Sequence, residues 1–293
     1  MSLWRDYELI DSGGLRKLER FGSYRLVRPD PQAIWRPSLP ESRWMDADAI
    51  YVRSGTGEGT WSFKRKLPSS WTVAFQELLF KVKPTAFKHT GLFPEQALNW
   101  LWLQQLLRLQ GEAGNKKVLN LFAYTGGATL AAASAGASVC HVDASKGSIK
   151  WAKQNQEISG LTDKPVRWIC DDVPAFVKRE VRRGKRYDAI IMDPPPYGRG
   201  VSGELWKIEK DLAPLVDLCM KKILSDRPVF FLINSYASGY SHISLKNFLE
   251  DFTSRFGGFV ESGDLLIPHT NSARFLPCGI YARWSGSGVK AEA

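Results

Sequence analysis

Acidic side chains follow three short apolar runs in the middle of this 293-residue sequence. Asp143 ends the run SVCHVD, Asp171 and Asp172 follow RWIC, and Asp193 ends AIIMD. Short apolar runs between turn-forming residues are typical of buried strands, and parallel strands end at one edge of their sheet. Carboxylates at that edge can accept hydrogen bonds from hydroxyl and amino groups of a ligand. The three acidic positions therefore predict a ligand site at the carboxyl edge of a sheet.

A glycine pair precedes the first of these acids. The segment VLNLFAYTGGAT combines a strand, a turn at Gly126 and Gly127, and the start of an Ala-rich helix. Glycine lets backbone approach a ligand closely, and Asp143 follows Thr125 by 18 residues (143 − 125), a position suited to both hydroxyls of a ribose. A dinucleotide would need the phosphate-binding pattern G-x-G-x-x-G, which YTGGAT lacks. An adenosyl ligand without phosphates is therefore favoured over NAD, and a purely structural glycine pair is the alternative.

The acid pair after the next strand offers a second contact to such a ligand. We expect Asp172, rather than Asp171, to accept a hydrogen bond from an adenine amino group. The alternative for either residue is an N-cap of the helix that begins at Pro174.

The segment DPPPYGRG is the most specific local pattern in the chain. Consecutive prolines fix the backbone and remove N–H donors, so the carbonyls of Pro194 and Pro195 can face a pocket in a rigid array. Tyr197 offers a ring on which a planar base can stack. A proline-rich surface loop is the alternative, although the segment directly follows a buried strand.

Helical patterns alternate with strand-like runs from residue 94 onwards. Apolar residues recur at spacings of three and four after Pro94, and further helices are predicted from residues 127, 146, 174 and 204. This alternation predicts an α/β fold, a doubly wound and mostly parallel Rossmann-like sheet. A helix and two strand-like runs end the domain, and the last two strands are expected to add an antiparallel edge.

Residues 1–85 read differently, as short strands separated by Gly, Pro and Ser. We predict a small β-rich N-terminal domain over 1–85, the α/β domain over 86–285, and a flexible tail over 286–293.

Composition narrows the class of protein. The sequence has 40 Lys and Arg against 30 Asp and Glu, a formal net charge of +10, which favours nucleic acid as a partner, although a modest basic balance can also have no functional meaning. No C-x-x-C pair occurs, so neither a zinc site nor a disulfide framework is indicated, and no metal is expected. The sequence shows neither a secretory signal nor a long apolar span, so we expect a cytoplasmic protein.

The motifs NLFAYTGG, HVDAS, WAKQN, CDDV and DPPPYG, in this order, resemble those of the class I S-adenosylmethionine-dependent methyltransferases. They are most similar to the bacterial 23S ribosomal RNA large-subunit (RlmI-like) group, over roughly residues 86–284, and FKHTGLFPEQ looks like that group's upstream cofactor motif. The resemblance implies S-adenosylmethionine as the cofactor, with Asp193 beneath the reactive centre and Asp193, Pro194, Pro195 and Tyr197 as the catalytic set. It implies a cofactor site formed by Thr90, Phe93, Gln96, Phe122, Thr125, Gly126, Asp143, Ser145, Asp172 and Asp193.

The sequence departs from this group in two places. Members that methylate C5 of a pyrimidine are expected to carry a cysteine after the fifth strand, whereas this chain reads NSYASGY, with Tyr236 in that place. Carbon methylation of cytosine needs a thiolate that adds to the ring, so Tyr236 favours a nitrogen as the acceptor. The N-terminal domain also does not read as the RNA-binding module of the best-known relatives.

Three hypotheses about function follow. The leading one is methylation of a base of RNA, with ribosomal RNA favoured. The second keeps the cofactor but uses a protein or a small molecule as acceptor, because fold does not fix function. The third is an RNA-binding protein that has lost catalysis.

Overall fold

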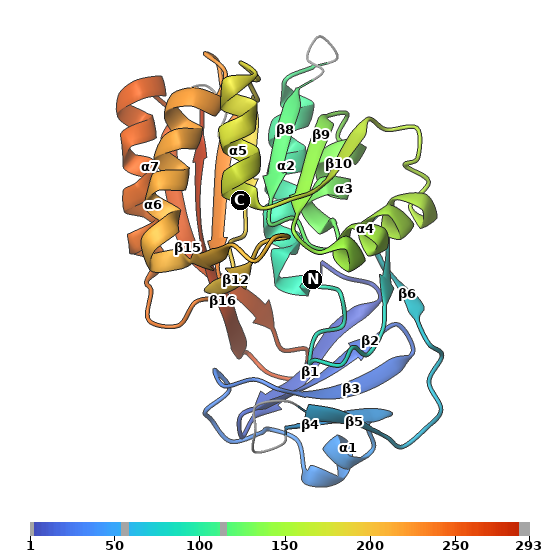
Figure 1. The fold of residues 1–293 in the computed structure, drawn as a ribbon. Coiled ribbons are helices and arrows are strands. Elements are labelled where there is room, and N and C mark those ends of the chain that lie inside the picture. Colours follow the sequence, from blue (N-terminus) through green and yellow to red (C-terminus); the bar gives the residue numbers. More distant parts are fainter. Residues whose placement is uncertain (1–2, 54–58, 112–115, 287–293) are drawn as a thin grey trace. The chain divides into compact units, whose positions relative to one another are not determined.

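The computed structural model describes residues 3–53, 59–111 and 116–286 (Figure 1). The chain forms two compact units: unit 1 contains Met1–Ala97 and Leu266–Cys278, and unit 2 contains Leu98–Leu265 and Gly279–Ala293. Residues 86–97 therefore group with the N-terminal region, whereas the sequence analysis assigns them to the α/β domain. Most of the predicted tail, from residue 287 on, lies outside the described residues.

Unit 1 contains a five-stranded sheet of order β1-β2-β3-β4-β5 and a separate β6-β7 hairpin. Its neighbouring strands pair antiparallel except β3 and β4, which are parallel. Buried and partly buried residues alternate at the start of β1, as expected for a strand with one face on a core. The elements are β1 (Tyr7–Gly13), β2 (Arg16–Phe21), β3 (Tyr24–Pro29), α1 (Glu41–Met45), β4 (Ala49–Arg53), β5 (Gly59–Phe63), β6 (Trp71–Phe75), β7 (Leu78–Val82) and the 3-10 turn η1 (Pro94–Gln96). The predicted β-rich N-terminal region is confirmed.

Unit 2 is built on a seven-stranded sheet of order β10-β9-β8-β11-β14-β16-β15 (Figure 1). The first five strands of this order run parallel, and β16 pairs antiparallel with β14. The strands are β8 (Lys117–Leu121), β9 (Ser138–Asp143), β10 (Val166–Cys170), β11 (Ala189–Met192), β14 (Phe230–Ser235), β15 (Phe259–Pro268) and β16 (Phe275–Ser285). The predicted mostly parallel sheet with an antiparallel edge is confirmed. Strands β15 and β16 begin or end in unit 1, because their junction, 266–278, belongs to that unit.

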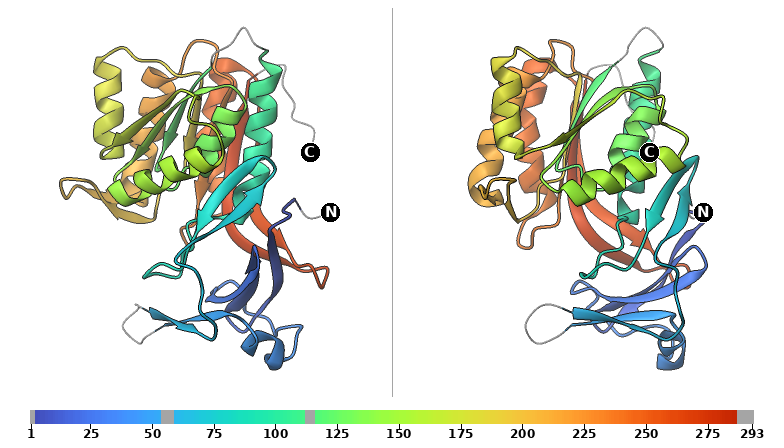
Figure 2. Two further views of the ribbon diagram at one scale, coloured as in Figure 1. Left: turned by 90° about the vertical axis from the view of Figure 1, so that its right-hand side faces the viewer. Right: turned by 45° about the vertical axis from the view of Figure 1, so that its right-hand side comes forward.

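Helices cover both faces of this sheet, as Figures 1 and 2 show. One group, on one face, consists of α2 (Ala97–Leu109), α3 (Gly127–Ser134) and α4 (Lys146–Ile158). The other consists of α5 (Val173–Arg182), α6 (Ile208–Leu218), the π-helical turn η2 (Cys219–Ile223) and α7 (His242–Phe256). The second group shares one apolar core with the sheet, in which Phe231, Phe252 and Trp284 are fully buried. Each face of the central strands is thus covered by helices, which explains their continuous apolar sequences.

The predicted start of one helix is wrong. The sequence predicts this helix from residue 204, but residues Leu205–Lys207 form strand β13, which pairs with β12 (Tyr197–Arg199), and α6 begins only at Ile208. The cause is tertiary: the loop after β11 folds back on itself as a hairpin before the helix starts. None of the described helices has the length and apolar character required to cross a bilayer.

Candidate functional site

The loops that follow β8, β9, β10 and β11 lie at one edge of the sheet of unit 2, because these strands are parallel and adjacent. Asp143, Asp172 and Asp193 each fall at or just after the end of one of these strands. The structure therefore brings the three predicted acids to the same edge, where open α/β sheets bind their ligands.

The turn after β8 has an unusual backbone. Phe122, Tyr124 and Gly126 all have positive φ, at 57°, 49° and 88°, although only the last is a glycine. Positive φ costs a non-glycine residue free energy, so the surroundings must hold this turn in place. Asn155 on α4 does part of this, because its buried side-chain amide donates to the carbonyl of Thr125 at 2.9 Å. Asn155, within WAKQN, was not assigned this role by the sequence analysis.

The glycine pair has a packing reason as well as a conformational one. A Cβ on Gly126 would lie 3.0 Å from the Cβ of Ala152 on α4, and a Cβ on Gly127 would lie 2.4 Å from the ring of Trp100 on α2. A side chain on Gly127 would collide with α2, and one on Gly126 would be unusually close to α4. At these two positions only the backbone can contact a ligand.

Asp143 ties this turn to the end of β9. One carboxylate oxygen accepts from the N–H of Tyr124 at 2.8 Å, and the other accepts from the N–H of Ser145 at 2.8 Å. Burial raises the pKa of Asp143 above its ordinary value, although these two N–H groups act in the opposite direction. Each oxygen keeps a lone pair, so the oriented carboxylate can still accept from two neighbouring hydroxyls.

Ser145 already has a structural role. Its hydroxyl accepts from the N–H of Ser148 at 3.1 Å and thereby caps the N-terminus of α4.

The two acids after β10 have separate environments. Asp171 forms an ion pair with Arg179 one to two turns along α5. Asp172 caps α5 by accepting from the N–H of Ala175 at 2.9 Å, so the capping alternative describes it correctly. The loop after β11 passes close by, because a Cβ on Gly200 would lie 2.9 Å from the second carboxylate oxygen of Asp172. Asp172 therefore lies between the N-terminus of α5 and the loop after β11.

The proline loop is fastened by a residue that the sequence analysis missed. The indole N–H of Trp206, on β13, donates to the carbonyl of Pro195 at 2.7 Å, and the N–H of Ile208 donates to the carbonyl of Pro196 at 3.1 Å. The ring of Trp206 also lies 4.9 Å from that of Phe122, centre to centre. No described residue donates to the carbonyl of Pro194. Of the two predicted carbonyls, that of Pro195 is therefore already engaged by the protein.

Tyr197 begins β12 and leaves its side chain in solvent. It is 53% exposed, although tyrosine usually buries much of its ring. Pro194, by contrast, is buried at the end of β11. The loop thus runs outward from the sheet edge and presents an aromatic face.

Three predicted cofactor residues, Thr90, Phe93 and Gln96, belong to unit 1. Thr90 is fully buried, and its hydroxyl oxygen has no hydrogen-bond partner among the described residues. Buried hydroxyls are usually paired, so this one is suited to a ligand contact.

Three of the four cysteines are wholly or partly shielded from solvent. Cys140 and Cys219 are buried, and burial raises the pKa of Cys140 to about 11 and that of Cys219 further. Cys278 is partly buried, and burial raises its pKa as well. Cys170 is exposed at the end of β10, which its apolar strand did not suggest, and its thiol donates to the carbonyl of Ala144 at 3.6 Å. Tyr236 follows β14 and its ring lies against Gly279.

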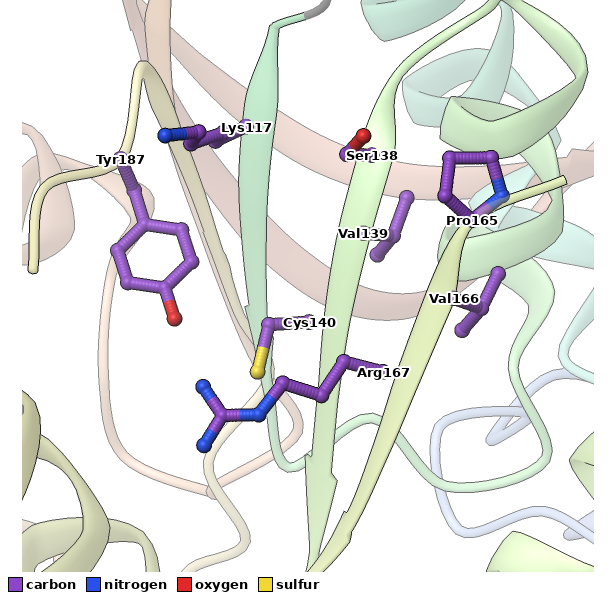
Figure 3. A pocket seen from close by; sticks show the side chains of 8 residues that line it. All are labelled: Lys117, Ser138, Val139, Cys140, Pro165, Val166, Arg167 and Tyr187. Atoms are coloured by element: carbon purple, nitrogen blue, oxygen red, sulfur yellow. The ribbon is translucent and has the colours of Figure 1, made fainter.

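A separate hollow of about 360 Å³ lies at the opposite edge, where the strands begin (Figure 3). Its lining contains no carboxylate that could hold a ribose; the lining residues are Lys117, Ser138, Val139, Cys140, Pro165, Val166, Arg167 and Tyr187. Among the described parts of the chain, no group of three or more His, Cys, Asp or Glu side chains is arranged to hold a metal ion.

Known proteins show the same combination of fold and motifs. A family model described as S-adenosylmethionine-dependent methyltransferase matches residues 57–219, more than half of the chain. The chain belongs to the S-adenosylmethionine-dependent methyltransferase family. The resemblance inferred from the motifs is confirmed, and S-adenosylmethionine is the cofactor of this methyltransferase.

The methyltransferase is similar along almost its whole length to a solved structure, the SAM-dependent methyltransferase from Agrobacterium tumefaciens. The two are 42% identical, with a TM-score of 0.90, over 96% of this chain and 91% of the other.

Similar curated relatives carry names that specify a substrate. Ribosomal RNA large subunit methyltransferase K from Neisseria meningitidis serogroup B is 34% identical over 74% of this chain and 62% of its own length. Ribosomal RNA large subunit methyltransferase K/L from Stutzerimonas stutzeri is 35% identical over 67% of this chain. The chain spans only about a quarter of the length of the K/L relatives, 26% and 28% for two of them.

Proposed function

We propose that this methyltransferase modifies a base of RNA, with ribosomal RNA the favoured substrate. The observation that carries the proposal is the loop after β11, which combines the exposed ring of Tyr197 with the carbonyl of Pro194, to which no described residue donates. An aromatic face and a fixed acceptor are what a flipped-out base with an exocyclic amine requires. The names of the relatives and the net charge of +10 support the same substrate class.

The cofactor is expected to lie along the loops after β8, β9 and β10. S-adenosylmethionine supplies an electrophilic methyl group on a positively charged sulfur. Asp143 would accept from both ribose hydroxyls, and Asp172 from the adenine amino group with the oxygen that does not cap α5. The rest of the proposed contacts, to the methionine and adenosyl parts, comprise Thr90, Phe93, Gln96, Phe122, Thr125, Gly126, Ser145 and Asp193.

The acceptor is expected to meet the proline loop. The carbonyl of Pro194 would accept from an N–H of the exocyclic amine and so direct the nitrogen lone pair at the methyl group. Pro195 would act indirectly, because its carbonyl holds Trp206 and thereby the shape of the hairpin. Tyr197 would stack on the base, and Asp193 would lie beneath the reacting nitrogen. Positioning of this kind can supply much of the rate enhancement, since the transfer mainly needs two groups in line within a dry site.

Transfer of labelled methyl groups tests the proposal. Ribosomal RNA from cells that lack the gene should accept label from S-adenosylmethionine, and RNA from cells that carry the gene should accept much less, because its target is already modified. Digestion to nucleosides would then identify the base and the atom. Label that appears only in protein or in small molecules would replace RNA as the acceptor, and cofactor binding without any transfer would indicate a catalytically inactive relative.

A nitrogen acceptor predicts that no cysteine is required. Each replacement of Cys140, Cys170, Cys219 or Cys278 by Ala should leave activity in the folded protein, and RNA that contains 5-fluorocytosine should form no covalent adduct. Attack on the ring would make such an adduct long-lived, because fluorine at C5 cannot leave as a proton does. A trapped adduct that maps to one of these cysteines would restore cytosine C5 as the target despite Tyr236.

A further inference from the structure

Residues 177–186 form a basic run, VKREVRRGKR, which has no role in the site described above. Its second half, residues 182–186, leaves the C-terminus of α5 and leads into β11. It therefore lies at the edge of the sheet where the parallel strands begin, opposite to the edge that carries the acids.

Two other segments of unit 2 meet this run. The N–H of Asp188 donates to the carbonyl of Lys117 at 2.7 Å, and the N–H of Tyr187 donates to the carbonyl of Ile223 at 2.9 Å. The guanidinium of Arg186 donates to the carbonyl of Leu224. The start of β8, the end of α5 and the segment after η2 thus form one continuous surface.

This surface carries mostly positive charge. Its exposed cations, which we call the basic edge, are Lys117, Arg182, Arg183, Lys185, Arg186, Lys222 and Arg227. Residues 182–188 and 222–229 are all described, and among their carboxylates only that of Asp226 is exposed. Glu180 is buried and is shared by Arg167, Arg183 and Tyr187.

Local stabilisation explains only part of this charge. A cation in the last turn of a helix interacts favourably with the helix dipole, which accounts for Arg182 on α5 and Lys222 on η2. It does not account for Lys117 or Lys185, which lie outside helices and form no ion pair with any described residue. The hollow of Figure 3 lies beside these cations, because Lys117 and Tyr187 line it.

We propose that the basic edge is a second RNA-contacting surface, which binds backbone phosphates of the substrate at a distance from the methyl acceptor. The proposal rests on the proposed RNA substrate. A five-residue strand such as β8 is roughly 17 Å long, so the basic edge lies about that far from the carboxyl edge, within reach of one structured RNA. Clustered Lys and Arg provide this kind of sequence-independent, salt-sensitive affinity.

The test compares two charge-reversal variants of the full chain. Arg182→Glu with Lys185→Glu removes two cations from the basic edge, and Lys150→Glu with Lys153→Glu makes the same charge change on the exposed face of α4. The probe is a short RNA hairpin with a duplex stem, and its dissociation constant is measured over a range of KCl concentrations. S-adenosylmethionine affinity and thermal unfolding serve as controls for folding.

The basic-edge variant should bind the hairpin roughly tenfold more weakly at physiological salt, and its slope of log affinity against log salt should fall by about one for each cation lost. The α4 variant should match the parent chain in both quantities. Equal affinity and equal slope in the two variants would overturn the proposal. Methyl transfer to RNA is a separate readout: an active parent whose basic-edge variant binds normally would refute this surface and leave the proposed function intact.

Discussion

Asp143 has two tasks that a single carboxylate can perform together. Its oxygens accept from the N–H groups of Tyr124 and Ser145, which fixes the strained turn after β8, and its remaining lone pairs are the proposed acceptors for the ribose hydroxyls. The backbone bonds orient the carboxylate before any ligand arrives. Less freedom is then lost on binding.

Replacement of Asp143 by Ala should weaken S-adenosylmethionine binding. Two hydrogen bonds from hydroxyls to a charged group should contribute about 1.5 to 3 kcal/mol, which corresponds to a loss of about ten- to hundredfold in affinity. Calorimetry of the purified protein would measure it. Asp226→Ala, at the opposite edge, is the matched control and should bind as the parent does; unchanged affinity in Asp143→Ala would remove Asp143 from the site.

The same residue predicts how cofactor binding depends on pH. Burial raises the pKa of Asp143, and only the ionised carboxylate can accept from both hydroxyls. Affinity should therefore be constant at neutral pH and should fall as pH drops through the raised pKa, an effect that Asp143→Asn should abolish.

Tyr197 should affect turnover more than cofactor affinity. Its exposed ring lies on the loop after β11. Loss of stacking in Tyr197→Ala should remove about 1 to 3 kcal/mol of transition-state stabilisation, measured as a lower kcat/KM for the RNA. Tyr197→Phe keeps the ring and should retain most of the activity. Normal methylation by Tyr197→Ala would show that this loop is structural.

At the scale of elements, a buried polar chain joins α3 to two strands. Asn120 on β8 donates to the hydroxyl of Thr129 at 2.9 Å, and that hydroxyl lies 2.9 Å from Nδ1 of His141 on β9. All three residues are almost completely buried. Because the chain reaches both strands, it fixes α3, and with it the glycine turn that begins the helix.

His141 should make stability depend on pH. Burial lowers its pKa to about 3 in the folded protein, from 6.5, so the unfolded chain binds more protons between these pH values. The contribution of His141 is complete above pH 6.5 and is lost as pH falls, at roughly 1.4 kcal/mol for each pH unit. Urea unfolding of His141→Asn should show a shallower pH slope than the parent over this window; equal slopes would mean that His141 accepts a proton in the folded state.

At the scale of the whole molecule, each of the two units has its own means of stabilisation. Unit 2 has a large apolar core and buries the carboxylate of Glu180, whereas unit 1 buries a complete ion pair. Arg28 forms two hydrogen bonds to Glu19 at 2.7 and 2.8 Å, and Tyr7 donates to the same carboxylate at 2.9 Å. Burial by itself would raise the pKa of Glu19, but attraction to Arg28 and Lys17 and these hydrogen bonds lower it.

Glu19→Gln should destabilise unit 1 strongly. Removal of one partner leaves the buried guanidinium of Arg28 without its counter-charge, which costs about 3 to 5 kcal/mol. Because the folded pKa of Glu19 is depressed, its contribution is present above the unfolded value and is lost as pH falls through the folded one. Urea unfolding would measure both effects. Glu41→Gln, which breaks the exposed pair with Arg16, should change little, and an equal loss in both variants would refute a special role for the buried pair.

The junction of β15 and β16 shows why the residues that make up unit 1 could not be predicted from local sequence patterns. His269 lies 2.7 Å from the hydroxyl of Ser12, and Thr270 donates to Glu8, so residues more than 250 positions apart meet. Short-range periodicity contains no information about such pairings.

The sequence by itself determined the α/β class, the order of the central strands along the chain and the edge at which Asp143, Asp172 and Asp193 gather. These features follow from local causes: buried parallel strands are continuously apolar, and consecutive parallel strands end on the same side. The same reasoning identified the methyltransferase motifs, because each motif lies in a single strand and its following turn.

Only the tertiary structure decided what each side chain does at that edge. It paired the carbonyl of Pro195 with the indole N–H of Trp206, and it replaced a predicted helix start by the β12-β13 hairpin. It also gathered Lys117, Arg182 and Lys185 at the opposite edge. In each case the deciding partner is supplied by another segment of the folded chain, and side-chain hydrogen bonds and charge clusters form only when folding brings such segments together.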